Sequence, residues 1–193
     1  LMTCSFAISI MMFLSFQVMV VFLNQGMPAL SPSAADVSIT MGNTPLDKSL
    51  LEQIRETEGV DKVFGRMEMA GISVSSDVGE GTVTLISYDD NQFGWAKEEL
   101  NQGSITPVME NTDRVLVTYQ DGVNWNVGDT VVLHTPSGDK QVTLAGILAT
   151  STASAVNSAG NSGYMICSEQ TFTALIGDLG YTTIDVQFSS AGG

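Results

Sequence analysis

Cysteine and histidine are scarce in this sequence of 193 residues, which contains two cysteines and a single histidine. Cys4 lies in an apolar stretch and Cys167 far away in a polar one, so we expect both thiols to be free. With His134 as the only histidine, the inventory argues against zinc fingers, Cys–His proteases and histidine-based catalytic triads.

Basic residues are also few. Lys and Arg together number 7 against 21 Asp and Glu, which gives a formal net charge of −14. Such a balance argues against binding to the nucleic-acid backbone or to an anionic lipid surface, and we predict no nucleic-acid partner. Residues 1–35 contain no charged side chain at all, so the acidic character belongs to the remainder of the chain.

The uncharged start contains a long hydrophobic run at residues 6–23, interrupted only by Ser9, Ser15 and Gln17. At about 1.5 Å per residue, residues 1–23 form a helix longer than the ~30 Å hydrocarbon core of a bilayer. We therefore predict a transmembrane helix at 1–23, with a truncated start, and a linker at 24–35. The alternatives are a cleaved signal peptide, for which 33–35 offers small residues, or a buried helix.

The segment after this run indicates its orientation. Residues 24–35 carry no Lys or Arg and are punctuated by Gly26, Pro28 and Pro32 before the acidic part begins. A basic flank is typical of the cytoplasmic side. We therefore expect a protein of the cell membrane with the bulk of this chain outside the cytoplasm.

Beyond the linker, the hydrophobic pattern predicts a mixture of strands and helices. Thr44 to Asp47 has the form of a helix start, with Thr44 as the cap and Pro45 at the first helical position. Gly59 is expected to end that helix in a left-handed conformation, and Ser168 to cap a later helix. Strands are predicted at 36–40, 62–69, 71–75, 82–88, 114–119, 130–134, 141–148, 164–167 and 181–188, helices at 44–58, 93–103 and 168–176, and a mobile loop at 149–163.

The order of these elements predicts an α+β fold in which helices lie against a sheet. The pattern changes at Asp89–Asp90 and returns to its earlier character at Tyr164.

The side chains capable of chemistry do not form an obvious catalytic constellation. Asp89 and Asp90 are a carboxylate pair, but neighbouring strand residues point to opposite faces, so we expect a strand end followed by a helix cap. Asp77 and Glu80 fit a solvated turn better than a cation site. We also expect His134 to be an ordinary histidine, Trp95 and Trp125 to be packing residues, and neither Gly65–Arg66 nor Gly128–Asp129 to hold phosphate. We predict no catalytic, cofactor-binding or metal-ligating residue, and hence no enzyme.

Taken in order, several segments resemble a known family. They are the apolar start, the 36–40 strand, the Leu50–Ile54 helix, Gly59–Val63, Asp129–Leu133, Val142–Ile147 and Ser168–Phe172. This order resembles the extracytoplasmic (periplasmic core) domain of MacB/FtsX-like ABC transporter permeases, inserted between their first and second membrane helices.

The resemblance implies a two-lobed architecture, with a porter-like α/β sandwich lobe at 36–90 and 164–189 and an inserted β-rich lobe at 91–163. It also implies a permease dimer, a cytoplasmic ABC ATPase partner and mechanotransmission, by which ATP hydrolysis drives export or an extracellular event. A peptide, a lipoprotein or a cell-wall hydrolase is the kind of outer partner that such domains meet.

Two other functions stay open. The first is a single-pass or secreted binding or sensor module without an ATPase. The second is an extracellular hydrolase that uses Asp89 or Asp90.

Overall fold

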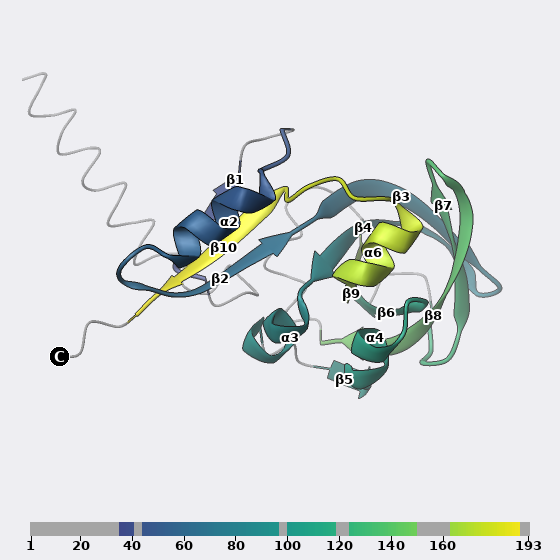
Figure 1. Ribbon diagram of the computed structural model, residues 1–193. Coiled ribbons are helices and arrows are strands. Elements are labelled where there is room, and N and C mark those ends of the chain that lie inside the picture. The colour runs from purple at the N-terminus through teal and green to yellow at the C-terminus, as the bar shows by residue number, and fades with distance from the viewer. Residues whose placement is uncertain (1–34, 41–43, 97–99, 119–123, 150–162, 190–193) are drawn as a thin grey trace, which may run out of the picture. The chain divides into compact units, whose positions relative to one another are not determined.

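The computed structural model describes residues 35–40, 44–96, 100–118, 124–149 and 163–189, and Figure 1 shows how their strands and helices are arranged. Strands outnumber helices in this part of the chain. The elements are β1 (Val37–Thr40), α2 (Lys48–Arg55), β2 (Val60–Arg66), β3 (Glu68–Ser76), β4 (Gly79–Tyr88), α3 (Asp90–Ala96), β5 (Leu100–Gly103), α4 (Thr106–Glu110), β6 (Arg114–Thr118), β7 (Thr130–Thr135), β8 (Gly138–Leu148), β9 (Gly163–Ser168), α6 (Glu169–Leu175) and β10 (Thr183–Phe188).

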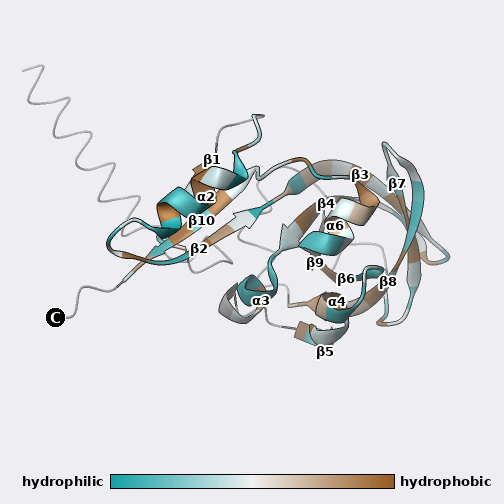
Figure 2. Ribbon diagram, viewed as in Figure 1, coloured by the Kyte–Doolittle hydropathy of each residue, from teal (hydrophilic) through white to brown (hydrophobic). Residues whose placement is uncertain are grey.

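One sheet joins strands from the two ends of the described chain. Its order is β1-β10-β2, and both pairings are antiparallel. Helix α2 covers one face of this sheet, where Leu51 is buried with Val63, Ile184 and Val186. Figure 2 shows hydrophobic residues on α2 where it meets the sheet. The apolar side of this helix therefore forms part of the core.

A second sheet has seven strands in the order β5-β8-β6-β9-β4-β3-β7. The long strand β8 also pairs with β7, which closes six of these strands into a ring. Strand β4 runs parallel to β9, and β6 runs parallel to β8, while the other pairings are antiparallel. The fold is thus a mixed α/β arrangement that consists mostly of strands.

The main hydrophobic core belongs to the seven-stranded sheet. It contains fully buried residues of β4, β6, β7 and β9, and Phe172 of α6 packs against them. A second cluster brings Tyr88 and Phe93 together with Val108 of α4, and the rings of Tyr88 and Phe93 meet edge to face at 5.3 Å.

The first described helix begins later than the sequence pattern predicts. Its cap is Asp47, whose Oδ1 accepts a hydrogen bond from the Ser49 backbone N–H at 2.8 Å. The predicted cap, Thr44, lies outside the helix because Leu46 is held in an isolated bridge to Tyr181. Gly59 does have a positive φ of 89°, but it lies in the turn before β2, since the helix ends at Arg55.

The predicted helix over 93–103 is wrong in its second half. Helix α3 spans Asp90–Ala96, and the segment from Leu100 to Gly103 forms strand β5, in which Leu100 pairs with Leu148. The apolar spacing that predicted one helix comes from Phe93 in the helix and Leu100 in the strand, which both pack in the second cluster. Helix α4 was not predicted.

The predicted membrane helix at 1–23, the linker at 24–34 and most of the loop at 149–163 lie outside the described residues. Within the described residues, no helix combines the length and the apolar character needed to cross a bilayer. The division into lobes at 36–90 with 164–189 and at 91–163 stays a prediction. Any such lobes share the seven-stranded sheet, because β4 and β9 come from the first set and β5 to β8 from the second.

Candidate functional site

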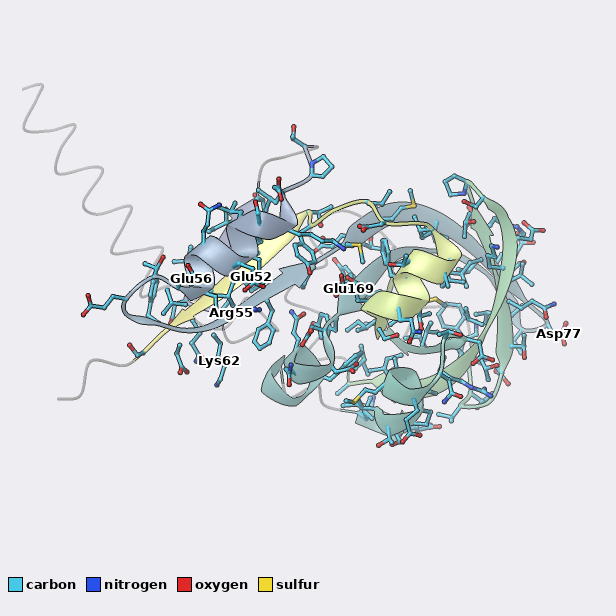
Figure 3. The ribbon with its side chains drawn as sticks, viewed as in Figure 1. Glu52, Arg55, Glu56, Lys62, Asp77 and Glu169 are labelled. Atoms are coloured by element: carbon cyan, nitrogen blue, oxygen red, sulfur yellow. The ribbon has the colours of Figure 1, made fainter. Side chains whose placement is uncertain are left out.

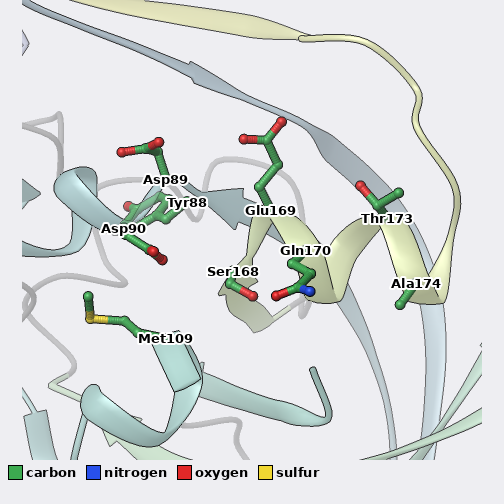
Figure 4. A pocket seen from close by; sticks show the side chains of 9 residues that line it. All are labelled: Tyr88, Asp89, Asp90, Met109, Ser168, Glu169, Gln170, Thr173 and Ala174. Atoms are coloured by element: carbon green, nitrogen blue, oxygen red, sulfur yellow. The ribbon is translucent and has the colours of Figure 1, made fainter. Parts of the chain in front are cut away.

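A cleft of about 590 Å³ opens where two parallel strands end. Tyr88 is the last residue of β4 and pairs with Ser168, the last residue of β9. Because parallel strands have their carboxyl ends at the same sheet edge, helices α3 and α6 both begin there. The cleft is lined by Tyr88, Asp89, Asp90, Met109, Ser168, Glu169, Gln170, Thr173 and Ala174, as Figure 4 shows.

The carboxylate pair predicted from the sequence lies at this cleft, in the role expected for a helix start. Asp89 Oδ1 accepts a hydrogen bond from the Asn91 backbone N–H at 2.8 Å, and the Asp89 carbonyl accepts one from the Gln92 N–H at 2.9 Å. The prediction of a strand end followed by a helix cap is confirmed, because β4 ends at Tyr88 and Asp89 caps α3. In Figure 4 the carboxylates of Asp89 and Asp90 point in different directions, so they do not converge on one reacting atom.

The cleft is acidic, with a third carboxylate from Glu169 and no basic residue in its lining. The negative charge of Glu169 is partly balanced, because Lys48 Nζ lies 3.5 Å from its Oε1 and the Tyr181 hydroxyl donates a hydrogen bond to it at 3.4 Å. Burial and the neighbouring Glu169 charge raise the pKa of Tyr181, which therefore stays a donor. Within the described ranges, no group of three potential ligands could hold a metal ion.

Ser168 shows why α6 begins at this edge. Its Oγ accepts a hydrogen bond from the Thr171 backbone N–H at 3.1 Å and lies 2.9 Å from the Thr171 hydroxyl. The predicted cap is therefore confirmed. Thr171 in turn donates to the Asn111 carbonyl at 3.2 Å, which ties the first turn of α6 to the segment after α4.

The structure places a serine and an aspartate on either side of the single histidine. Ser75 Oγ lies 3.0 Å from Nε2 of His134, and Nδ1 of His134 lies 2.8 Å from Oδ1 of Asp139. A shallow cavity of about 360 Å³ lies beside them and is lined in part by Ser73, Glu80 and Thr82. We refer to Ser75, His134 and Asp139 as the Ser–His–Asp row.

The register of the β7–β8 hairpin brings two members of this row together. The turn of this hairpin lies at Pro136–Ser137, because Thr135 already pairs with Gly138. This short turn places Asp139 in β8, directly opposite His134. Ser75 reaches the same place through the pairing of β3 with β7, which a count of residue types does not contain.

A buried ion pair also escaped the sequence analysis. Arg66 was considered only beside Gly65 as a phosphate cradle, whereas its Nε lies 2.8 Å from Oδ2 of the fully buried Asp185. Ser38 of β1 donates to the other oxygen of Asp185 at 2.6 Å, and Glu68 lies 3.2 Å from Arg66 Nη1. Burial acts to lower the pKa of Arg66, but the carboxylates of Asp185 and Glu68 outweigh it and raise that pKa.

The other sequence candidates have structural roles. The Trp125 indole is buried and donates to Ser76 Oγ at 3.3 Å, which confirms a packing role, and Asp129 Oδ2 accepts from the Asn126 N–H in a turn. Asp77 lies at the β3–β4 turn, as labelled in Figure 3. Cys167 is a free, fully buried thiol whose pKa is raised by burial.

Comparison with known proteins gives a consistent set of solved structures. No family model and no curated protein matches the chain. The extracellular domain of the noncanonic ABC-type transporter YknZ from Gram-positive bacteria matches with a TM-score of 0.57 and 13% identity, over 80% of this chain and 85% of that chain. The periplasmic region of MacB from Actinobacillus actinomycetemcomitans matches with a TM-score of 0.53 and 16% identity, over 80% of this chain and 68% of that chain.

A domain assigned to a permease protein from Porphyromonas gingivalis is also similar, with a TM-score of 0.52 and 11% identity, over 78% of this chain and 71% of that chain. At such identities the likeness concerns the fold. It confirms the resemblance seen in the sequence: the chain has the fold of the extracytoplasmic domains of ABC transporter permeases.

Proposed function

We propose that this chain is the extracytoplasmic domain of an ABC transporter permease subunit and that it transmits movement from membrane helices to an event outside the cytoplasm. The observation that carries the proposal is the fold likeness to the YknZ extracellular domain, which extends over 80% of this chain. The domain would act mechanically, with a cytoplasmic ABC ATPase as the source of movement and a second permease copy as its dimer partner.

The path of the chain through the three-stranded sheet supports a mechanical role. Strand β1 and strand β10 are antiparallel neighbours, so the start of one lies beside the end of the other. The Asp36 N–H donates to the Val186 carbonyl at 2.9 Å, and the Phe188 N–H donates to Asp36 Oδ2 at 2.8 Å. The chain therefore enters and leaves the described domain at one end of one sheet, where two membrane connections would both attach.

The three-stranded sheet is connected directly to the seven-stranded sheet, so a displacement could pass between them. Strand β10 pairs with β2 along most of its length, and β2 continues through Met67 into β3 of the seven-stranded sheet. The Arg66–Asp185 ion pair joins β2 to β10 at the end of this ladder, and Ser38 adds β1 to the same contact. Hydrogen-bonded strands move together, so tilt at β1 or β10 would reach β3.

The remaining parts of the proposal follow from the resemblance. The segment at 1–23 would be the first membrane helix, and 24–35 would connect it to β1. The protein would lie in the cell membrane with the bulk of this chain outside, as two lobes at 36–90 with 164–189 and at 91–163. Its outer partner would be a peptide, a lipoprotein or a cell-wall hydrolase.

The experiment uses the complete permease with its ATPase in proteoliposomes. A short Gly-Ser insertion within residues 24–34 should uncouple the domain, because a flexible insert cannot transmit tilt to β1. We expect ATP hydrolysis to continue, while the ATP-dependent change in distance between fluorophores on two domain copies disappears. The matched control is the same insertion between Asp77 and Val78, in an exposed turn that lies off the proposed route.

Two results would contradict the proposal. Unchanged ATP-dependent movement with the insertion at 24–34 would show that this segment does not carry the coupling. A complete gene without further apolar spans would instead favour the single-pass or secreted binding module.

A further inference from the structure

Three strands bring the Ser–His–Asp row together on one face of the seven-stranded sheet. His134 of β7 pairs directly with Asp139 of β8, and on its other side with Ser73 of β3. Ser75 is two residues further along β3, so its side chain leaves the same face as Ser73. Diagonal neighbours of this kind lie within reach of long side chains across a sheet. The alternate residues Val74 and Leu133 point into the core, which fixes the register.

The hydrogen bonds of the row assign a role to each nitrogen of the imidazole. An ionised Asp139 only accepts, so it accepts from Nδ1 of His134 at 2.8 Å. In a neutral imidazole this bond leaves Nε2 without a proton, as the acceptor for the Ser75 hydroxyl at 3.0 Å. The order nucleophile, base and positioning carboxylate is the one by which serine nucleophiles are activated on unrelated folds.

We propose that Ser75 is an acyl-acceptor site, activated by His134 and positioned through Asp139. This role is additional to mechanical coupling and does not depend on it. Ser75 Oγ attacks the carbonyl carbon of an activated ester, forming a new C–O bond, and the bond from that carbon to the leaving oxygen breaks. The Oγ proton passes to His134 Nε2 and then to the departing oxygen, so no oxidant or further reactant is needed.

The surroundings of Ser75 restrict the acyl donor. The cavity of about 360 Å³ beside it admits a small molecule, and its lining is mostly polar. Glu80 lies opposite Ser75 on β4, and Asp139 is 70% exposed, so two carboxylates face an approaching donor. A small donor that is uncharged or cationic therefore fits, and an anionic one is repelled.

The test uses the full chain in detergent with p-nitrophenyl acetate, an uncharged acyl donor, and an uncharged alkyl fluorophosphonate as a trap that stays attached. We expect acetyl and phosphonyl groups on Ser75, whose hydroxyl contacts the imidazole, and not on Ser73, which shares its strand and face. His134→Gln should slow acylation of Ser75 about 100-fold, because it removes general-base catalysis.

The positioning role of Asp139 has its own readout. Asp139→Asn should lower the acylation rate at least several-fold and Asp139→Glu should restore it, while the unfolding midpoint stays unchanged in both because the carboxylate is exposed. Ser49→Ala, a change on the surface of α2, should leave the rate unaltered. Equal labelling of Ser73 and Ser75, or an unchanged rate in His134→Gln, would overturn the proposal. Release of p-nitrophenolate that persists undiminished in Ser75→Ala would do so as well.

Discussion

The buried ion pair between Arg66 and Asp185 makes a strong prediction about stability. Asp185 is fully buried, its Oδ2 lies 2.8 Å from Arg66 Nε, and its Oδ1 accepts from Ser38 at 2.6 Å. Asp185→Asn removes the negative charge with almost no change in volume. The substitution therefore isolates the electrostatic contribution of this contact from packing.

The size of the expected loss in unfolding free energy depends on the contacts that Arg66 keeps after the substitution. Breaking a buried ion pair at one partner costs about 3–5 kcal/mol, because the other charge is left uncompensated. Arg66 is 14% exposed and keeps Glu68 at 3.2 Å, so we expect the lower end, about 3 kcal/mol. For a domain of this size that corresponds to a fall of roughly 6–12 °C in the unfolding midpoint.

The assay is urea unfolding followed by circular dichroism, which gives the free energy of unfolding. Asp61→Asn is the control, because Asp61 is 52% exposed and lies 3.7 Å from Lys62, so its loss should cost less than about 1 kcal/mol. The double change Arg66→Met with Asp185→Leu should recover most of the loss, since neither charge is then buried alone. A cost below about 1 kcal/mol for Asp185→Asn would refute the reasoning.

Three further predictions concern packing and charge. Gly65→Ala should destabilise by about 1–3 kcal/mol in urea unfolding, because its Cβ would lie 2.5 Å from the Tyr181 ring, whereas a Cβ at Gly94 meets nothing within 4 Å and should be tolerated. In a Cys4→Ser background, Cys167 should react with a disulfide reagent only upon unfolding, because it is buried and its pKa is raised. The bond from Lys48, and next the Gly180 N–H, lower the pKa of Asp178, so the stabilising contribution of Asp178 is present above the ordinary aspartate pKa and is lost as pH falls through the lowered value. An acid titration of stability in Lys48→Met should therefore show a smaller loss.

Local patterns predicted the elements that need only neighbouring residues. Ser168 begins α6 because its own hydroxyl accepts from the helix that follows, and this cap can be read within four residues. The alternation of β10 predicted a strand because buried Ile184 and Val186 face α2. Asp89 was likewise understood as a cap before its partners were known.

Contacts between distant segments could not be predicted in this way. Leu100 continues a helical spacing from Phe93. It lies in a strand only because it pairs with Leu148 at the edge of β8. Arg66 meets Asp185 because β2 and β10 are neighbours, and the spacing along the chain gives no sign of that pairing. The Ser–His–Asp row depends on two such pairings at once, β7 with β8 and β3 with β7, and a count of residue types contains neither.

The junction between the two sheets determines whether movement could pass from one to the other. Met67, the residue between β2 and β3, is completely buried, and its backbone makes two bonds to one residue of β4. Its N–H donates to Ser87 Oγ at 2.9 Å, and its carbonyl accepts from the Ser87 N–H at 2.9 Å. A flexible hinge would have exposed, weakly bonded backbone at this point. Because Met67 is instead held against β4 while Arg66 is held against β10, the junction would, under the proposed mechanical role, transmit a displacement and not absorb it.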